Sequence, residues 1–545
     1  MLAPFDESEA NSVPEPSIRR LGDRNSLIFA LLTAFLVHLA WYAQGIAHGG
    51  FANLDVAGIA YNARLLLDGQ LPYVGSAEVK PPGTFFLFAA LLSMGSMRLV
   101  WIFAVIWATL ASYATGRLAG AIWGQRVVPL AILLHAGGSL VATEGDINYS
   151  FWATLPFTAA AAMSLGDGTK RRRWFLIGAI AAFSFLFKQS TVLLLFVLML
   201  GIWQEFAHTR SFKRSLLRPT VHGFLGAGLV FGALALPYLL QGELAALLAG
   251  LGFSGGWWVS YAETAASSSG NVAWALLDGI RCIGEKHYLG SSLVLLAVIP
   301  FSGRWRRFPG DLPALVFLLA ALGGVAATMR FYPHHLAQLW PALVVLGLRP
   351  SGPIHWLLND RLRGALLPAA AALGLGVLAS THFWIQGRND YIFERDQVVM
   401  DVCEELAPHL GDSDSVLALG WPAWSIYEHC GRRAPGPIYK DITFIITANT
   451  NTCMRRSDPV SLLPGPAADR YLADFDQNRP SAVLWYREHL PGADPAKDWD
   501  DLSARLGGYV ETPITQRFVL FVRPDLASRI DVVGRRESRR QASLR

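Results

Sequence analysis

Charged residues are scarce in this sequence, and that scarcity excludes an ordinary soluble protein. Only 16% of its 545 residues are charged, whereas 52% are hydrophobic, and average soluble domains have about 25% charged residues. Long apolar runs joined by short polar loops are typical of a polytopic membrane protein. The sequence therefore predicts an α-helical membrane protein with a folded soluble part near its C-terminus.

The apolar runs predict the number of membrane spans. Several approach the roughly 20 residues that a helix needs to cross the hydrocarbon core, so we expect about eleven spans. The runs are 26–46, 98–116, 127–142, 150–166, 174–187, 190–206, 221–241, 288–302, 311–329, 334–348 and 364–385. A further apolar piece, 84–94, is shorter and predicts a helix at the membrane surface.

The basic residues predict the orientation of these spans, because Lys and Arg near span ends favour the cytoplasmic side. They cluster at 19–24, 117–126, 170–173, 210–218, 303–307 and 349–363, which are alternate loops of the predicted arrangement. We therefore expect a cytoplasmic N-terminus and an extracytoplasmic C-terminal part, in the cell inner (plasma) membrane. The first span lacks a small-residue cleavage site, so we interpret it as an anchor and not as a signal peptide.

Four regions follow along the chain. They are a cytoplasmic segment (1–25), a transmembrane domain (26–389) with a first outer loop (47–97), an extracytoplasmic α/β domain (390–528) and a basic tail (529–545) whose composition predicts disorder. Helix-like and strand-like runs alternate in the α/β domain, as in DQVVMDVCEELAPHL, SVLALGW, SAVLWY and RFVLFV. That domain lacks a Gly-rich phosphate loop, a nucleophile elbow and metal-ligand spacing, so we expect it to bind or shield and not to catalyse.

Cysteine is also scarce. The four cysteines, Cys282, Cys403, Cys430 and Cys453, all fall outside in the predicted topology, where disulfides are permitted. Four cysteines allow three connectivities, between which the sequence does not decide. Free or half-buried thiols are the other interpretation.

Ionisable residues gather at the predicted outer ends of the spans, where they are costly and usually pair or line a cavity. They are Asp55, Arg64, Asp68, Glu78 and Lys80 in the first loop, Glu144 and Asp146 in the second, Lys188 in the third, and Arg330, His334 and His335 in a later one. The sequence therefore predicts a polar site on the outer face.

Asp55 has two interpretations. It stands at the start of a predicted helix, 54–67, whose apolar stripe is Val56, Ile59, Ala63, Leu66 and Leu67 and which ends at Gly69. We expect this helix to lie on the membrane surface. The Asp55 carboxylate then either caps the helix by accepting backbone N–H bonds or serves as a base that faces a substrate hydroxyl.

The other candidates also have structural alternatives. Lys80, before a Pro-Pro-Gly turn, and Lys188, at a helix end, either bind phosphate or extend to the membrane interface as lysines commonly do. Glu144 and Asp146 orient an acceptor, bind a divalent ion through oxygen or cap the span that starts near Asn148. Adjacent histidines point apart on a helix, so His334 and His335 favour phosphate contact or helix capping over a shared metal.

The combined motifs resemble those of the C-type (GT-C) glycosyltransferases. They are an Asp in the first outer loop, YNARLLLDGQLPY, KPPG, a later acidic loop and RFYPHHLAQLWP. Within that group the chain is most similar to bacterial relatives of the dolichyl-phosphate-mannose protein mannosyltransferases, which include lipid A aminoarabinose and galacturonic acid transferases. The resemblance covers about residues 26–348 and extends loosely to LALGWPAWSIYEHCGRRAP in the outer domain.

This resemblance implies an inverting glycosyltransferase. The implied donor is a polyprenyl-phosphate sugar, and the acceptor is a hydroxyl of lipid A or core, a polysaccharide, a lipid or a protein at the outer face. Asp55 is the implied base and Glu144 and Asp146 the further acids, while Lys80, Lys188, Arg330, His334 and His335 are the candidates for the donor phosphate. Tyr61, Tyr73 and Tyr332 of the same motifs are candidates for the acceptor and sugar pocket. The resemblance names no cofactor beyond a candidate divalent ion at Glu144 and Asp146.

His335 stands where many relatives have Tyr, and Leu54 precedes Asp55 where eukaryotic relatives have a second acid. These departures leave the acceptor and any metal open. A membrane transporter is one rival function, although no repeat or matched pair of broken spans is visible. A non-catalytic subunit of a polysaccharide assembly system is another. Nucleic-acid binding is not expected, because the basic residues are spread over cytoplasmic loops.

Overall fold

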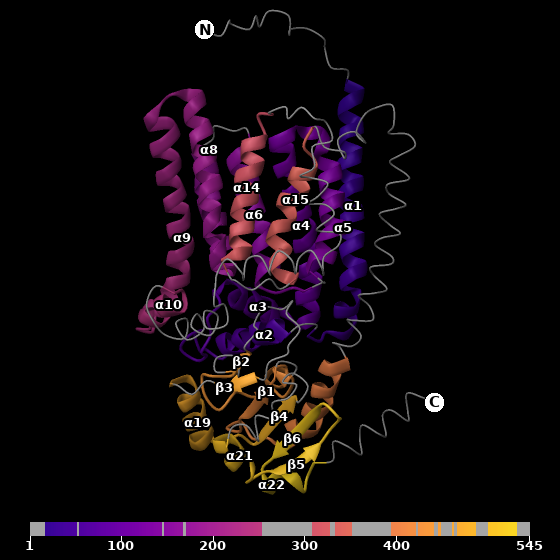
Figure 1. Ribbon diagram of the computed structural model, residues 1–545, viewed down its shortest axis with the longest axis vertical. Helices are drawn as coiled ribbons and strands as arrows, with labels where there is room; N and C mark the ends of the chain where they lie inside the picture. Colours follow the sequence, from indigo (N-terminus) through magenta and orange to yellow (C-terminus); the bar gives the residue numbers. More distant parts are fainter. Residues whose placement is uncertain are drawn as a thin grey trace, which may run out of the picture.

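A helical bundle and a C-terminal sheet lie at opposite ends of the molecule, with two short helices between them (Figure 1). This computed structural model describes residues 17–51, 54–143, 146–166, 171–252, 308–327, 333–350, 394–420, 423–440, 445–447, 460–462, 466–486 and 500–530. The predicted spans 288–302 and 364–385 and nearly all of the basic tail lie outside the described residues.

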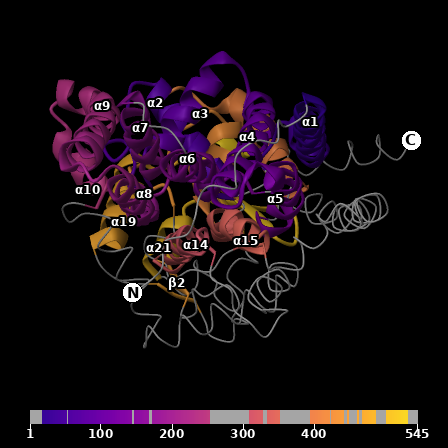
Figure 2. The ribbon, with the colours of Figure 1, turned by 90° about the horizontal axis from the view of Figure 1, so that it is seen from above.

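The bundle is built from apolar helices that alternate in direction. They are α1 (Ser17–His48), α4 (Met97–Trp123), α5 (Val128–Thr143), α6 (Tyr149–Leu165), α7 (Arg171–Phe187), α8 (Leu194–Thr209), α9 (Arg218–Leu240), α14 (Asp311–Ala326) and α15 (Leu339–Gly347), with α10 (Leu244–Gly250) after α9. Four short helical turns, η1 (Gln125–Val127), η2 (Gln189–Leu193), η3 (Lys213–Leu217) and η4 (Pro333–Gln338), join them. Seen from above, α9 and α1 lie on opposite sides of the bundle (Figure 2).

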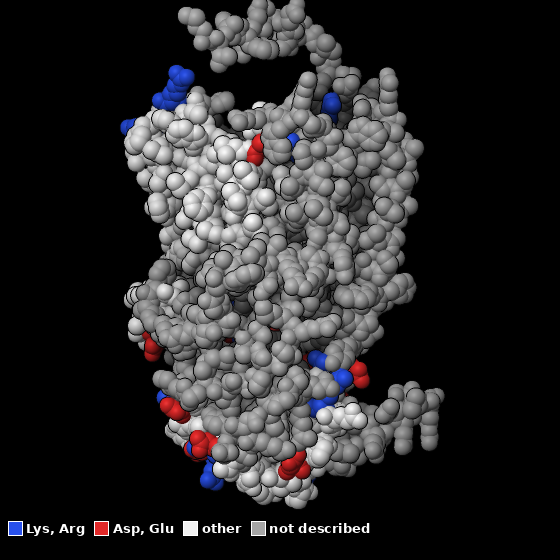
Figure 3. Space-filling model, viewed as in Figure 1, with Lys and Arg blue, Asp and Glu red and all other residues white. Residues whose placement is uncertain are grey.

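Helix length and surface both indicate a membrane protein. In the described part of the chain, four segments are long and apolar enough to cross a membrane: Arg24–His48, Met97–Trp123, Gln189–Ala207 and Lys213–Leu240. On the face seen in Figure 3, charged residues gather toward the two ends of the molecule and white side chains of the bundle lie between them. Large apolar side chains such as Phe29, Phe196 and Phe224 are exposed on these helices, as expected for a surface in contact with lipid.

Two further apolar segments are far shorter than the roughly 20 residues of a span. The apolar helix α3 (Gly83–Met94) has 12 residues and lies beside α2 (Leu54–Leu67) at the end of the bundle nearest the sheet (Figure 1). The segment predicted as a span at 334–348 is the 3-10 helix η4 followed by α15, which has 9 residues.

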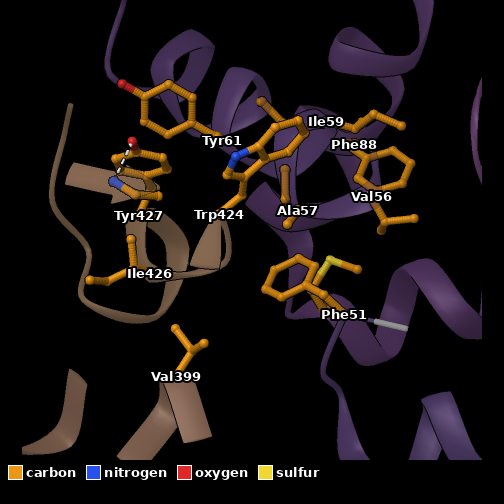
Figure 4. Close-up of a cluster of buried hydrophobic side chains, with 14 of the residues drawn as sticks. Phe51, Val56, Ala57, Ile59, Tyr61, Phe88, Val399, Trp424, Ile426 and Tyr427 are labelled. Carbon is orange, nitrogen blue, oxygen red and sulfur yellow. Dashed lines mark hydrogen bonds between the residues drawn. The ribbon is translucent and has the colours of Figure 1, made fainter. Parts of the chain in front are cut away.

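Helix α2 has the predicted extent, and Gly69, just beyond it, has the left-handed φ of +81° that favours glycine. The prediction of a single buried stripe is wrong. Leu67 is exposed, whereas Ala60, Tyr61 and Asn62, which lie outside the stripe, are buried. Both faces are covered because α3 packs on one side of α2 and the C-terminal domain on another (Figure 4).

The C-terminal domain contains a four-stranded mixed sheet in the order β1-β4-β6-β5. Its strands are β1 (Val416–Leu419), β4 (Ala482–Tyr486), β5 (Val510–Pro513) and β6 (Phe518–Val522), and β1 and β4 are parallel whereas the other pairs are antiparallel. A separate antiparallel pair is formed by β2 (Ile445–Thr447) and β3 (Val460–Leu462). β1, β4 and β6 coincide with strand-like runs of the sequence.

Both faces of the sheet are covered, which explains why β1, β4 and β6 are buried at every position. Helices α19 (Pro466–Asn478) and α21 (Asp500–Leu506) pack on one face. A helix at 394–406, followed by η5 (Ala407–His409), packs on the other. This second core continues through α18 (Ile426–His429) into α2, α3 and α4, while α22 (Pro524–Ala527) closes the chain.

One of the allowed cysteine pairings is present. Cys403 and Cys430 form a disulfide with their Cα atoms 4.7 Å apart. The bond joins the 394–406 helix to the residue that follows α18. Cys282 and Cys453 lie outside the described residues.

Candidate functional site

A buried lysine lies in the short loop between α7 and η2. Lys188 is 7% exposed, and its Nζ donates a hydrogen bond of 2.8 Å to Oγ of Ser150. Among the residues that the structure describes, no carboxylate forms an ion pair with this lysine. Burial lowers the pKa of Lys188 to about 7, and the nearby Lys80 ammonium contributes to this shift.

Lys80 approaches the same place from the first loop. Its Nζ lies over the ring of Tyr149, 5.8 Å from the ring centroid. One residue before it, the Val79 carbonyl accepts a hydrogen bond of 3.3 Å from Nε2 of Gln189. The loops that carry Lys80 and Lys188 therefore meet at Tyr149 and Ser150, in the first turn of α6.

The start of α6 favours negative charge. Asn148 precedes the helix, and its side chain accepts a hydrogen bond of 3.0 Å from the Ser150 N–H. Helix N-termini attract anions through their partial positive charge, and two lysines here add to that field. The site therefore combines two lysine side chains with the positive end of a helix dipole.

An acid and a histidine form a pair next to this helix start. Nδ1 of His334 lies 3.1 Å from Oδ2 of Asp146, and Asp146 is buried. The structural interpretation of Asp146 as the cap of α6 is wrong, because Asn148 is the capping residue. Asp146 instead joins η4 to the loop that precedes α6.

The two adjacent histidines do not point apart. The ring centroids of His334 and His335 lie 4.6 Å apart in an edge-to-face arrangement. The prediction that the two side chains point apart is wrong because it assumed an α-helix, whereas this segment is a 3-10 helix that packs against α5 and α6. Within the described part of the chain, no group of three His, Cys, Asp or Glu side chains is arranged to hold a metal ion. Glu144, Arg330 and Tyr332 lie outside the described residues.

The Pro-Pro-Gly turn holds the Lys80 loop against the Lys188 loop. A Cβ atom on Gly83 would lie 2.5 Å from the Leu186 carbonyl oxygen, so only glycine allows this close approach. On the other side, the Tyr73 hydroxyl donates a hydrogen bond of 2.6 Å to the Lys80 carbonyl. Tyr73 also stacks on Tyr238, with ring centroids 6.5 Å apart. The close approach at Gly83 and the hydrogen bond from Tyr73 together fix the position of the Lys80 backbone.

Asp55 lies in the first turn of α2 and is partly buried. A carboxylate there interacts favourably with the helix dipole, so its structural and catalytic interpretations both stay open. Val56, the next residue, lies beside Phe88 of α3 (Figure 4). Because α3 begins directly after the Lys80 turn, the helix of Asp55 and the loop of Lys80 pack as neighbours.

Tyr61 is engaged by the C-terminal domain. Its ring lies 4.8 Å from that of Tyr427 and 4.5 Å from that of Tyr439, between centroids, and its hydroxyl accepts a hydrogen bond of 3.1 Å from the Ala434 N–H. Burial raises the pKa of Tyr61 to about 12. This position between α2 and the C-terminal domain was not evident from sequence.

Sequence reasoning gave no role to the most buried ion pair near this site. Nζ of Lys440 lies 2.6 Å from Oε2 of Glu78, and the two side chains are 6% and 3% exposed. Burial alone would raise the pKa of Glu78, but Lys440, with hydrogen bonds from Tyr439 and Val79, lowers it. The closeness of Glu78 to Lys80 was a usable signal, whereas nothing in the sequence connects it with Lys440, 362 residues away.

Comparisons with known proteins were made by sequence and by fold. No protein-family model matches the chain, and no curated protein matches it significantly in sequence. Crystal structures of ArnT from Cupriavidus metallidurans do match its fold. The undecaprenyl phosphate complex is 13% identical with a TM-score of 0.53, and the apo form is 12% identical with a TM-score of 0.54. Each match covers 94% of this chain and 99% of the other. The chain therefore shares the fold of ArnT, which confirms at the level of the fold the resemblance to C-type glycosyltransferases.

Proposed function

We propose that this protein is an inverting glycosyltransferase that moves a sugar from a polyprenyl-phosphate donor to a hydroxyl of a cell-envelope acceptor. The acceptor is lipid A or core, a polysaccharide, a lipid or a protein, reached at the outer face of the inner membrane. One observation carries the proposal. Lys188 is a buried lysine with no carboxylate partner among the described residues, and it meets Lys80 at the N-terminus of α6.

A phosphate is the ligand that best fits this arrangement. A buried ammonium without a counter-ion is costly, and a bound phosphate diester would supply the missing negative charge. Lys80 would add a second positive charge, and the helix start would add backbone N–H groups. The shared fold supports the same proposal, since one ArnT structure holds undecaprenyl phosphate. In this proposal Arg330 and His334 complete the donor-phosphate site.

The proposed reaction needs a base on one side of the sugar and a cationic site on the other. The Asp55 carboxylate takes the proton of the acceptor hydroxyl, and the freed oxygen attacks the anomeric carbon. The bond from that carbon to the phosphate oxygen breaks, and the phosphate leaves with the electron pair. Lys80 and Lys188 stabilise the charge that develops on it. Attack opposite the leaving phosphate inverts the anomeric configuration.

Asp146 is proposed to orient the acceptor beside the donor. Its carboxylate is already engaged with a histidine at 3.1 Å, and that favours a positioning role over direct attack. If a divalent ion participates, Glu144 and Asp146 are its proposed oxygen ligands. Tyr73 and Tyr332 are proposed near the sugar. The basic segment η3 (KRSLL) joins α8 to α9, and these two helices meet at the end of the bundle away from the C-terminal domain (Figure 1), which supports a cytoplasmic location for that end.

The test is transfer of radiolabelled sugar from a panel of polyprenyl-phosphate donors to native membrane lipids and glycans. Purified protein is compared with Asp55→Asn and with the matched control Asp68→Asn. Asp68 lies just beyond the same helix, is 39% exposed and pairs with Arg433 at 3.1 Å. We expect a rate of transfer that Asp55→Asn lowers by about a hundredfold to ten-thousandfold and that Asp68→Asn leaves unchanged. Full transfer by a folded Asp55→Asn protein would refute the base assignment.

A transporter or a non-catalytic assembly subunit remains the rival function. Both predict binding of a polyprenyl-phosphate ligand without transfer. Donor binding by the folded wild-type protein, with no product from any donor or acceptor fraction, would favour these rivals over the proposed enzyme.

A further inference from the structure

The carboxylate of Glu78 links two parts of the protein through its two oxygens. Oε1 accepts hydrogen bonds from the backbone N–H groups of Val79, at 2.9 Å, and Lys80, at 3.3 Å. Oε2 accepts from the Tyr439 hydroxyl and from Nζ of Lys440, each at 2.6 Å. One oxygen therefore fixes the backbone that carries Lys80, and the other holds the C-terminal domain.

Lys440 is held in this position by contacts on several sides. It is buried, and its Nζ lies over the rings of Trp424 and Tyr439, at 5.2 Å and 4.9 Å from their centroids. Aromatic faces stabilise a desolvated ammonium. Nearby, the Ala77 N–H donates a hydrogen bond of 2.7 Å to the Pro437 carbonyl. The first loop and residues 437–440 thus form one continuous contact.

The same lysine reaches helix α2. A Cβ on Gly58 would lie 2.7 Å from Cε and 2.9 Å from Nζ of Lys440, so the glycine makes room for it. Asn62, one turn further along, donates hydrogen bonds of 2.7 Å to the Tyr439 hydroxyl and 2.9 Å to the Gly58 carbonyl. Residues three or four apart share one face of a helix, so Asp55, Gly58 and Asn62 lie along one side of α2.

We propose that Lys440 and Glu78 are positioning residues through which the C-terminal domain sets the Lys80 loop against the helix of Asp55. Lys440 contacts α2 at Gly58 and the Lys80 turn through Glu78. Its position therefore fixes the distance between the proposed base, Asp55, and the proposed phosphate-binding residue, Lys80. The C-terminal domain is then a required part of the donor site and not a separate shield. This inference rests on the proposed function.

A charge swap separates positioning from simple docking. Glu78→Lys with Lys440→Glu keeps opposite charges across the contact but places a carboxylate against the Trp424 and Tyr439 rings, so the melting temperature of the variant reports how well the domain still docks. It also moves the carboxylate to the other partner, which leaves the Val79 and Lys80 N–H groups without their acceptor. Binding of undecaprenyl phosphate to the full-length detergent-solubilised protein is measured directly, together with its melting temperature. We expect a folded swap variant that binds about tenfold more weakly.

Further variants keep the test decisive if the swap variant does not fold. Gly58→Ala pushes against Lys440 without changing any charge, and alanine suits a helix better than glycine; we expect binding several-fold weaker. Lys440→Arg keeps the positive charge, so this variant should retain most of the wild-type affinity for undecaprenyl phosphate. Arg64→Ala is the control, because Arg64 also contacts this domain through Glu428, at 2.6 Å, but is 48% exposed and away from the Lys80 turn. Its binding should be unchanged.

The outcomes distinguish this inference from the proposed function. If Lys80→Met weakens binding while the swap and Gly58→Ala variants bind as the wild type does, the positioning role is refuted and the proposed donor site stands. If Lys80→Met binds as tightly as the wild type, the proposed phosphate site is refuted and this inference with it. If Arg64→Ala weakens binding as much as Gly58→Ala does, docking alone explains the effect and positioning is refuted.

Discussion

Lys188 and Ser150 are joined by a hydrogen bond of 2.8 Å, 38 residues apart in the chain. The contact brings a buried ammonium to the first turn of α6, beside the side chain of Lys80. A lysine buried in this way is unfavourable for folding but suited to holding an anion. The predictions below follow from that conflict and from the close packing around it.

Replacing Lys188 by methionine should separate stability from binding. Methionine has a similar length and removes the desolvated charge, so we expect the melting temperature to rise by about 3 °C. The affinity for undecaprenyl phosphate should fall at least about tenfold, because one charge-assisted hydrogen bond is lost. Thermal unfolding and ligand binding in the same detergent check both effects. A variant that melts lower than the wild type and binds equally well would show that the lysine is structural.

The affinity for the donor should depend on pH. In the ligand-free protein the pKa of Lys188 is about 7, and a neighbouring anion raises the pKa of a lysine. Binding above pH 7 therefore takes up a proton, so affinity should fall as pH rises through 7, by up to about tenfold per pH unit. Below pH 7 it should be constant.

This pH effect is best measured with a polyprenyl-phosphate sugar, whose diester does not titrate in this range. Lys188→Arg serves as the control, since arginine keeps its charge at every pH used. Its affinity should be flat across the same interval. Parallel pH curves for the two proteins would contradict the assignment of the titration to Lys188.

Gly83 should tolerate no side chain. In Gly83→Ala the new Cβ would lie 2.5 Å from the Leu186 carbonyl oxygen, so the start of α3 and the last turn of α7 must separate, and the adjoining Lys80 and Lys188 loops with them. We expect a loss of about 1–3 kcal/mol in stability and weaker donor binding. Gly95→Ala, beyond the other end of α3, is the matched control, because the nearest atom to its Cβ would lie 3.6 Å away. Equal melting temperatures and affinities for both variants would refute the close packing of these loops.

Reduction of the Cys403–Cys430 disulfide should destabilise the C-terminal domain. The bond closes a segment with a sequence separation of 27, for which chain entropy predicts about 3.5 kcal/mol. Thermal unfolding with and without a reductant should show the difference, and the double variant Cys403→Ser, Cys430→Ser should resemble the reduced protein. A double variant with the same melting temperature as the oxidised wild type would contradict this prediction.

Much of the local structure could be predicted from the sequence because its causes are local. The helix Leu54–Leu67 has the predicted bounds, since an apolar period and a glycine beyond the last turn mark them. The strands Val416–Leu419 and Phe518–Val522 lie within predicted runs. Of the candidate site, the loops of Lys80 and Lys188 lie together, as expected from the gathering of polar residues at one end of the predicted spans. The roles of His334 and His335 were less predictable, because their geometry depends on a 3-10 helix.

The sequence by itself determined that this is a helical membrane protein, where many of its helices and strands run and which ionisable residues stand at the loops. Hydrophobic period, glycine stops and charge placement act over a few residues, so they can be read along the chain. Only the tertiary structure decided that Lys440 pairs with Glu78, that His334 pairs with Asp146 and that Cys403 bonds with Cys430. Such pairs are selected by the packing that buries them, because a buried polar group requires whichever partner the fold brings within reach.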